Sequence, residues 1–514
     1  MSSTIAPPAR PVRPASGSGT PGPDAATSPD RSGARRLPDL AVALFAGVWL
    51  TSSWERIGAP LGLSHDGQNA GVFGSAAREL VDDPFGSHLG SRLANGHGVY
   101  SNHPPLLNWL LGIGHAVTGD NPAGLRVPMV IAALVLIAAT YRLLRLLVSS
   151  PWAAAIGTIA GLGLPMFFVY GSMPDTPMLG LPFGVMLLSQ VVAAETTPPK
   201  RSWLMVATAA GCALAGWEAV FFAVIIATVA LVRGRRGDRT STTTGRAVFT
   251  GLAIGGAVTI AWIAWADGGL TRLADQFLFR SGAADVPFTV GEAVVAQIQY
   301  LADVYGIVLV LAMFAALPAL RVPAVRRHLP TVVGVCLVYH VGFWQGATYH
   351  DYWSYWWQLP MAMCFAGAIE AIALSTTTQR RHVAAVAAAA LVAVGPLWTL
   401  VGHSQAEREY RSGLEVADLL ESIERPPDQD RVLTFGLGLP VSWASWSTDQ
   451  PVEPLNLAQL RKIATIHPDW MVIAHCEVKL PDRGPGLCDR LPAWAPRAGD
   501  VVVTDPVQLA AVIG

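Results

Sequence analysis

Long apolar segments separated by short polar ones recur along most of the chain. A helix that crosses the roughly 30 Å hydrocarbon layer of a membrane needs about 20 mostly apolar residues. Membrane-spanning helices are predicted at 38–54, 122–144, 152–171, 176–194, 203–216, 217–232, 247–266, 299–319, 331–346, 354–374 and 384–403. The pattern therefore predicts an all-α polytopic membrane protein with about eleven transmembrane helices.

The fifth and sixth segments are each short and could form one kinked helix, because only Gly216-Trp217-Glu218 interrupts them. Basic residues favour two helices, since cytoplasmic loops are enriched in arginine and lysine. With two helices here, all the basic clusters fall on one side of the membrane: Arg31/Arg35/Arg36, Arg142/Arg145, Lys200/Arg201, Arg233/Arg235/Arg236, Arg321/Arg326/Arg327 and Arg380/Arg381. The predicted orientation in the plasma membrane has the N-terminus in the cytoplasm and the C-terminal part outside.

The two ends of the chain differ from the apolar middle, 38–403. Residues 1–37 are rich in Pro, Ser, Gly, Ala and Arg and have little to bury, which predicts a disordered cytoplasmic tail. Residues 404–514 combine a charged helical stretch, short β-like runs and Pro or Gly turns, which predicts a small extracytoplasmic α/β domain. Cys476 and Cys488 in this domain could pair if it faces an oxidising compartment.

The predicted outer loop at 55–121 contains two amphipathic segments. Asp66 precedes a helical pattern at 69–81, whose apolar face carries Val72, Phe73, Ala76, Ala77 and Leu80. A second apolar helix is predicted at 105–117 and is opened by prolines, which suit a helix start. It is too short to cross the membrane, so it is predicted to lie along the membrane surface.

Composition and charge narrow the class of protein. The 514 residues are 52% hydrophobic and 14% charged, and the mean hydropathy is +0.41. Soluble domains carry roughly 25% charged residues, so this chain requires a lipid environment. A net charge of −1 argues against nucleic acid as a partner. The sequence contains no Walker A motif, no His-x-x-x-His and no Cys-x-x-Cys, which argues against ATP and against a dedicated zinc site.

Several short motifs follow one another in the first outer loop and the second predicted span. Asp66 leads the loop helix, His103-Pro104-Pro105-Leu106 opens the second one, and Gly124-Leu125-Arg126-Val127-Pro128 follows. This order resembles the C superfamily of membrane glycosyltransferases, within it the group of protein O-mannosyltransferases and lipid A aminoarabinose transferases (glycosyltransferase family 39-like). Asp175, at the outer start of the fourth span, and Tyr349-His350-Asp351-Tyr352 add to the resemblance, which covers roughly residues 40–375.

The resemblance implies transfer of a sugar from a polyprenyl-phosphate carrier to an acceptor hydroxyl on the outer face. Phosphate is a good leaving group, so the chemistry needs a base for the hydroxyl and positive charge on the developing phosphate. The residues that it implies are Asp66 and Asp175 as catalytic carboxylates, Arg126, His103 and Arg280 as phosphate contacts, and His350 and Tyr352 in the donor or acceptor pocket.

A divalent metal ion on Asp66 and Asp175 is an open expectation. Many relatives have two consecutive acids where this chain has Asp66-Gly67, so the second carboxylate must come from elsewhere or be absent. This departure leaves both the metal and the geometry of the acceptor undecided.

Each of these site residues could instead have a purely structural role. Asp66 could cap its helix, Arg126 could lie in the headgroup layer, and the aromatic residues around His350 could form an interfacial belt. Two other functions stay open for the whole chain: a transporter or flippase of lipid-linked sugars, and a non-catalytic envelope-assembly protein. The absence of a convincing internal repeat and the acids in the outer loops argue against the transporter. The sequence does not identify the sugar or the acceptor, which could be a protein, a glycan or a lipid.

Overall fold

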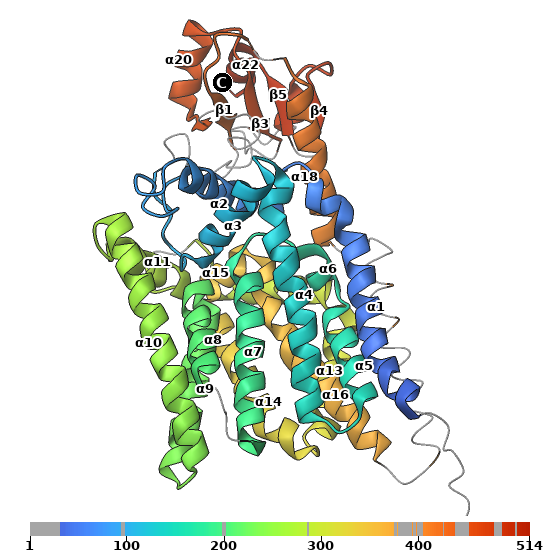
Figure 1. Ribbon diagram of the computed structural model, residues 1–514. Helices are drawn as coiled ribbons and strands as arrows, with labels where there is room; N and C mark the ends of the chain where they lie inside the picture. The colour runs from blue at the N-terminus through green and yellow to red at the C-terminus, as the bar shows by residue number, and fades with distance from the viewer. Residues whose placement is uncertain are drawn as a thin grey trace, which may run out of the picture.

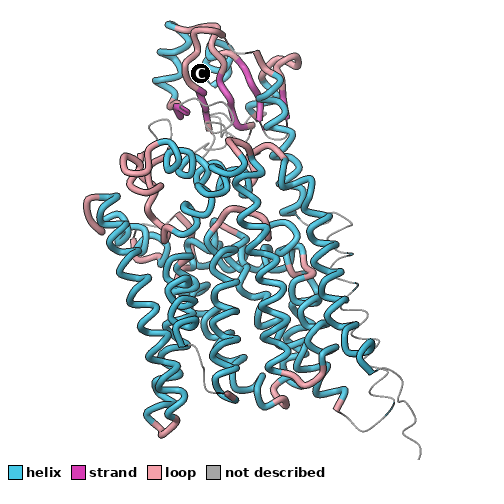
Figure 2. Tube along the Cα trace, viewed as in Figure 1, coloured by secondary structure: helices cyan, strands magenta, loops and turns pink. Residues whose placement is uncertain are grey.

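A bundle of helices forms the body of the molecule, and a sheet-containing domain stands at one end of it (Figures 1 and 2). The structure, a computed structural model, describes residues 31–93, 98–197, 202–284, 287–374, 405–424, 426–436, 452–476, 486–498 and 501–513, with the single residues 378, 393 and 397. The helices up to residue 235 are α1 (Arg31–Gly58), α2 (His65–Asp82), α3 (Leu106–Thr118), α4 (Pro122–Leu147), α5 (Pro151–Leu162), α6 (Pro165–Tyr170), α7 (Thr176–Thr196), α8 (Ser202–Ala215) and α9 (Trp217–Arg235). The next are α10 (Arg239–Asp267), α11 (Thr271–Ser281), α12 (Val290–Val304), α13 (Gly306–Ala319), α14 (Pro323–Gly342), α15 (Trp344–Tyr349), the 3-10 helix η2 (Asp351–Trp357) and α16 (Gln358–Ala373).

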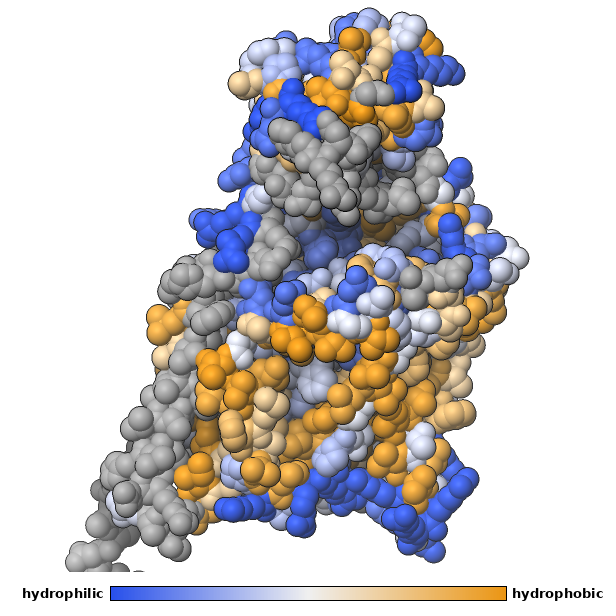
Figure 3. All heavy atoms as spheres, turned by 180° about the vertical axis from the view of Figure 1, so that it is seen from behind, coloured by the Kyte–Doolittle hydropathy of each residue, from blue (hydrophilic) through white to orange (hydrophobic). Residues whose placement is uncertain are grey.

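Apolar side chains cover the outside of the bundle. Leu44, Phe249, Phe314, Leu317 and Val341 are all exposed. Figure 3 shows this apolar surface between hydrophilic regions at the two ends of the molecule. An apolar surface of this size is unfavourable in contact with water, so the outside of the bundle suits the membrane interior.

Five helices in the described residues are long and apolar enough to cross a membrane: the Arg36–Gly58 part of α1, α4, α7, α9 and α10. The bent pair of α12 and α13 would make a sixth, and α3, α5 and α8 are shorter apolar helices. The predicted last span, 384–403, falls almost entirely outside the described residues. The count of about eleven spans therefore stays a prediction.

Two predicted spans are interrupted. The segment 152–171 divides into α5 and α6 at Gly163-Leu164, because Pro165 starts a new helix with its missing N–H in the first turn. The segment 299–319 divides at Tyr305, where α12 and α13 meet at 94°. Gly306 has a φ of +51°, which glycine adopts without the steric cost of a Cβ.

Other predicted boundaries differ less. Gly216 separates α8 from α9, as the two-helix interpretation predicted. The helix α1 begins at Arg31, inside the predicted disordered tail, where Ala34, Arg35 and Arg36 favour a helix. Both predicted loop helices are present as α2 and α3, which pack on each other, and α3 also packs on α4.

The C-terminal residues form a five-stranded mixed sheet with helices on both faces. Its strands are β1 (Val432–Phe435), β2 (Val452–Pro454), β3 (Val472–His475), β4 (Arg497–Ala498) and β5 (Val501–Thr504), in the order β2-β1-β3-β5-β4. The helices are α18 (Gln405–Ser422), α20 (Leu457–Ile466), α21 (Leu487–Arg490) and α22 (Pro506–Ile513). β1 pairs with β2 and β3 in parallel, whereas β5 pairs with β3 and β4 in antiparallel orientation.

Side-chain alternation along the strands divides this small domain into two apolar layers. Leu433, Val472 and Val502 pack with α20 and α22 in one cluster, whereas Ile473 and Val503 pack with α18 in the main cluster of the molecule. Cys476 and Cys488 form a disulfide with their Cα atoms 5.0 Å apart.

The helix α18 fastens this domain to the loop before α2. A Cβ on Gly62 would lie 2.1 Å from the Gly413 carbonyl oxygen, so the two backbones touch in a way that only glycine permits. The Leu63 amide donates to the same carbonyl at 3.3 Å. The Arg56 guanidinium also lies over the Tyr410 ring, 4.2 Å from its centre. The helix α18 therefore contacts both α1 and the loop before α2, and this loop leads directly to Asp66 in the first turn of α2.

Candidate active site

A polar cavity of about 170 Å³ is lined by residues of the loop helices and of the bundle. These elements meet at the end of the bundle that carries the sheet domain (Figure 1). Segments that are far apart in the sequence supply the wall of the cavity: α2, the stretch before α3, and the first turns of α7 and α9, together with the end of α11 and the segment around η2. Its lining residues are Gln68, Asn69, Val72, Phe73, Tyr100, His103, Asp175, Thr176, Pro177, Glu218, Arg280, His350, Tyr352 and Trp353.

Asp175 is the N-cap of α7 and presents a buried carboxylate to this cavity. One oxygen accepts from the Thr176 amide at 2.6 Å, and the other accepts from Asn69 Nδ2 at 2.8 Å. Burial raises the pKa of Asp175, and hydrogen bonds from Thr176 and Tyr352 together with the charge of Arg280 lower it only in part. A carboxylate with a raised pKa is a stronger base than an ordinary aspartate.

Arg280 supplies the positive charge of the cavity. It lies in the last turn of α11, and its guanidinium stacks 5.0 Å from the centre of the Trp353 ring. No carboxylate of the described residues forms an ion pair with it. Its N–H groups are thus free to bind an anion, and a planar guanidinium suits phosphate.

His103 and His350 are neutral partners in the same wall. Burial and the nearby Arg280 charge lower the pKa of His103 to about 3. Burial also lowers the pKa of His350 well below that of an exposed histidine, and the Tyr352 ring lies 5.0 Å from its ring. Neither imidazole carries a charge near neutral pH, so each can contribute hydrogen bonds but no attraction between charges.

Asp66 and Arg126 form a buried ion pair with each other. Arg126 Nη2 lies 2.6 Å from Asp66 Oδ2, and Nη1 donates to the Ala59 carbonyl at 2.5 Å. The side chains are 5% and 1% exposed. Ser64, not Asp66, caps α2. Neither member of the pair lines the cavity, and the roles predicted for them stay predictions.

The carboxylates of the site do not fit a metal ion. No group of three or more His, Cys, Asp or Glu side chains in the described ranges could hold one. Asp66 faces a guanidinium, which would repel a divalent cation, and both oxygens of Asp175 already accept hydrogen bonds.

An apolar groove of about 240 Å³ adjoins the polar cavity. The two share His103, Arg280 and Trp353. Beyond these shared residues the groove is lined by Asn102, Trp217, Val220, Phe221, Leu273, Gln276, Phe277, Tyr339 and Phe343. The cationic Arg280 thus lies between the polar cavity and the apolar groove. This arrangement suits a ligand with a charged head and an apolar tail.

Sequence reasoning missed five polar residues that line the cavity: Gln68, Asn69, Tyr100, Thr176 and Glu218. Asn69 links α2 to Asp175 and also donates to the Tyr352 hydroxyl at 3.0 Å; its position one turn after Asp66 could have revealed it. Glu218 is buried, one oxygen accepts from the Tyr339 hydroxyl at 2.7 Å, and the other has no partner in the described part of the chain. The sequence signal that could have identified Glu218 is its position at the start of an apolar helix, where an ionisable residue often has a functional role.

Comparisons with known proteins agree with this architecture. The family model for dolichyl-phosphate-mannose-protein mannosyltransferases matches residues 102–265. Comparison with curated protein sequences gives no match. The crystal structure of ArnT from Cupriavidus metallidurans bound to undecaprenyl phosphate is 15% identical, covers 92% of this chain and 98% of that chain, and has a TM-score of 0.58.

The oligosaccharyltransferase of Archaeoglobus fulgidus is similar in fold too. Its apo crystal structure is 11% identical over 86% of this chain and 70% of that chain, with a TM-score of 0.55. Its complex with Zn and sulfate is 12% identical over 85% and 68% of the two chains, with a TM-score of 0.50. The resemblance predicted from the sequence is thereby confirmed in the family model and in the fold.

Proposed function

We propose, from the premise that this chain has the fold of the C superfamily of membrane glycosyltransferases, that it moves a sugar from a polyprenyl-phosphate carrier to an acceptor hydroxyl. The observation that carries the proposal is the junction of the polar cavity with the apolar groove at Arg280. A polyprenyl-phosphate sugar has the matching three parts: an apolar chain, a phosphate and a polar sugar.

The parts of such a donor would occupy the site in order. The prenyl chain lies in the groove between Phe221, Phe277 and Phe343. The phosphate binds Arg280, and the neutral His103 supplies an N–H rather than a charge. The sugar lies in the polar cavity against Asn69, Tyr352 and Glu218. Bound undecaprenyl phosphate in the similar ArnT structure supports a ligand of this class.

Asp175 is the proposed base. The acceptor oxygen forms a bond with the anomeric carbon, while the bond between that carbon and the phosphate oxygen breaks. The hydroxyl proton passes to the Asp175 carboxylate, and Arg280 stabilises the negative charge on the departing phosphate. Asn69 and the Thr176 amide hold the carboxylate in place. Asp66, paired with Arg126, acts by holding α2 and therefore Asn69 in position.

The decisive experiment measures sugar release from radiolabelled polyprenyl-phosphate hexoses by the full chain in detergent, with and without EDTA. We expect the wild type to turn over at least one donor, and EDTA to leave the rate within about twofold, because the carboxylates do not fit a metal. Arg280→Gln should lower kcat/KM by about 10- to 100-fold, the equivalent of losing one charged hydrogen bond.

Arg272→Gln is the matched control. Arg272 lies on the same helix, half-exposed and paired with Asp267, and lines neither the cavity nor the groove. Equal losses in the two variants would refute the phosphate contact of Arg280. A folded wild-type protein that releases sugar from no donor would refute the transferase and favour the flippase or the assembly protein.

A further inference from the structure

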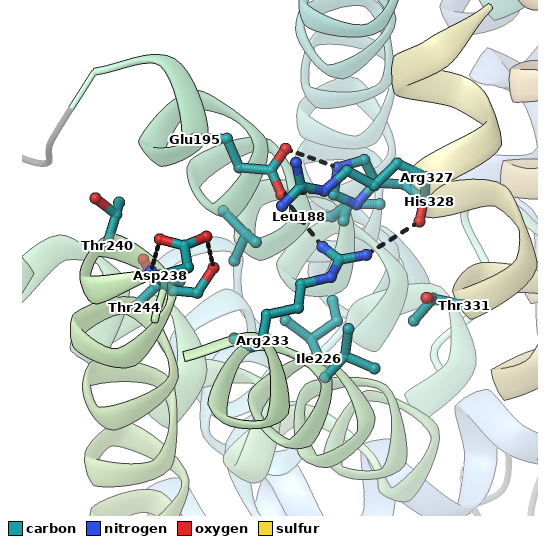
Figure 4. A pocket seen from close by; sticks show the side chains of 14 residues that line it. Leu188, Glu195, Ile226, Arg233, Asp238, Thr240, Thr244, Arg327, His328 and Thr331 are labelled. Atoms are coloured by element: carbon teal, nitrogen blue, oxygen red, sulfur yellow. Dashed lines mark hydrogen bonds and ion pairs between the residues drawn. The ribbon is translucent and has the colours of Figure 1, made fainter. Parts of the chain in front are cut away.

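A second polar cavity lies at the opposite end of the bundle, where α7, α9, α10 and α14 meet. The helix α7 runs from Asp175 at the active site to Glu195 at this cavity, which corresponds to about 30 Å at 1.5 Å per residue. The cavity measures about 110 Å³. Its polar lining includes Glu195, Arg233, Thr244, Arg327, His328 and Thr331 (Figure 4).

Two arginines in this cavity share one carboxylate. Arg233 Nη1 lies 3.3 Å and Arg327 Nε 3.0 Å from the same oxygen of Glu195, and His328 lies 3.3 Å from the other oxygen. Arg233 also donates to the Arg327 carbonyl at 3.3 Å. Figure 4 shows the side chains of Arg233 and Arg327 converging on the Glu195 carboxylate. One carboxylate neutralises only half of the charge of two guanidinium groups, and several of their N–H donors stay available.

Among the described residues the lining holds one further acid, Asp238, whose negative charge acts on Arg233 and Arg327 and balances the remaining charge of the pair. The Asp238 carboxylate accepts from the Ser241 amide at 3.0 Å and from the Ser241 hydroxyl at 2.6 Å, and these bonds lower the pKa of Asp238. The surrounding loop adds further positive charge at Arg235, Arg236 and Arg239. A surface of this composition attracts anions.

A buried hydroxyl points to a ligand independently of the charges. Thr244 is only 3% exposed and lines the cavity, yet its Oγ1 has no hydrogen-bond partner within the described ranges. An unsatisfied buried hydroxyl destabilises the folded protein, and a phosphate oxygen in the cavity would accept its hydrogen bond.

The aliphatic lining residues lie on the membrane-spanning helices: Leu188 and Val191 on α7, and Ile226, Val229 and Ala230 on α9. A ligand here therefore meets cations at the end of the bundle and apolar side chains toward the membrane interior. We propose that this cavity binds the phosphate group of an anionic phospholipid, in the leaflet opposite the transfer site.

Lipid binding to the purified full chain tests the proposal. The protein is stripped of lipid in detergent, and the affinity for phosphatidylglycerol is compared with that for phosphatidylcholine and for inorganic phosphate by native mass spectrometry. We expect preferential binding of phosphatidylglycerol, and at least tenfold weaker binding when Arg233→Gln and Arg327→Gln are combined. The matched control combines Arg321→Gln with Arg326→Gln, which removes equal charge at the same end of the bundle outside the cavity and should leave the affinity within twofold.

Two further variants separate a lipid site from a purely structural ion cluster. Glu195→Gln removes the competing carboxylate and should strengthen phosphatidylglycerol binding, whereas a structural cluster would only be weakened by it. Thr244→Val leaves every ion pair intact and should weaken binding severalfold, so it tests the site even if the arginine variants fail to fold.

Equal affinity in the double-arginine variant and its control would overturn the proposal. So would unchanged binding in Thr244→Val or weaker binding in Glu195→Gln. Inorganic phosphate that binds as tightly as phosphatidylglycerol, with the same sensitivity to these variants, would show a free-phosphate site and overturn the lipid assignment.

Discussion

Asp66 and Asp175 are both buried carboxylates, and their neighbours give them different chemistry. Asp66 is neutralised by Arg126, whereas Asp175 receives hydrogen bonds from an amide and an asparagine and has no ion-pair partner among the described residues. An Asp66 oxygen is occupied by Arg126, and Asp66 does not line the cavity. Burial raises the pKa of Asp175, which lines the cavity, so Asp175 is suited to accept a proton from a bound acceptor.

Asp175→Asn should separate catalysis from stability. We expect the turnover number to fall by about 10²- to 10⁴-fold, the usual contribution of a general base. Burial raises the pKa of Asp175, so the native state disfavours its charge, and the variant's melting temperature should be unchanged or higher at pH 7. Asparagine also caps helices well. A melting temperature that falls together with activity would point to a structural role instead.

The pH dependence of turnover follows from the same shift. A raised pKa means that Asp175 is protonated at a higher pH than an ordinary aspartate, whose pKa is about 4. Turnover should therefore fall on the acid side with a midpoint above that value, and the residual activity of Asp175→Asn should lack this limb. His103 is neutral down to pH values near its pKa of about 3 and adds no limb in the neutral range. An acid limb that persists in the variant would assign the titration to another group.

The Asp66–Arg126 pair connects two elements, α2 and α4. Removal of one partner from a buried ion pair leaves an uncompensated charge and costs about 3–5 kcal/mol. We expect Asp66→Asn and Arg126→Met each to lower the melting temperature and the turnover. The double variant should be more stable than the sum of the single losses predicts, because no unpaired charge remains.

Thermal unfolding of the four proteins in the cycle measures this coupling. If the loss of stability in the double variant equals the sum of the losses in the two single variants, Asp66 and Arg126 do not stabilise each other. Normal stability of Asp66→Asn together with a complete loss of turnover would instead support the catalytic role that the sequence predicted for Asp66.

The contact between Gly62 and Gly413 couples the sheet domain to the loop before α2. Gly62→Ala would drive a Cβ to within 2.1 Å of a backbone oxygen, so α18 must shift away. We expect a lower melting temperature and a loss of protection from hydrogen exchange in both α2 and α18. Gly58→Ala is the control, since a Cβ there meets nothing within 4 Å. Equal behaviour of the two variants would show that this contact does not hold the loop.

At the scale of the whole molecule, the predicted orientation can be measured by thiol labelling. The native cysteines give little background, because Cys212, Cys336 and Cys364 are buried and the other two form the disulfide. In intact cells a membrane-impermeant maleimide should label Asp275→Cys, which lies at the active-site end. Arg236→Cys, at the opposite end, should be labelled only after the cells are permeabilised. The reverse pattern would refute the cytoplasmic N-terminus.

The sequence by itself determined the class of protein and much of its local structure. Apolar segments of membrane length, the helix start at residue 122 and the break at Gly216 are local features, so the pattern predicted them. The order of motifs around Asp66 and His103 predicted the resemblance that the family model and the fold confirm.

Only the tertiary structure decided which polar groups meet. Asn69, Asp175 and Tyr352 come from distant parts of the chain, and no periodicity relates their side chains across the cavity. Arg126 was expected at the phosphate but lies against Asp66, while Arg280 lies at the junction of cavity and groove. The reason is physical: helix and strand periods specify the face on which a side chain lies, whereas the packing of whole helices specifies which faces come together.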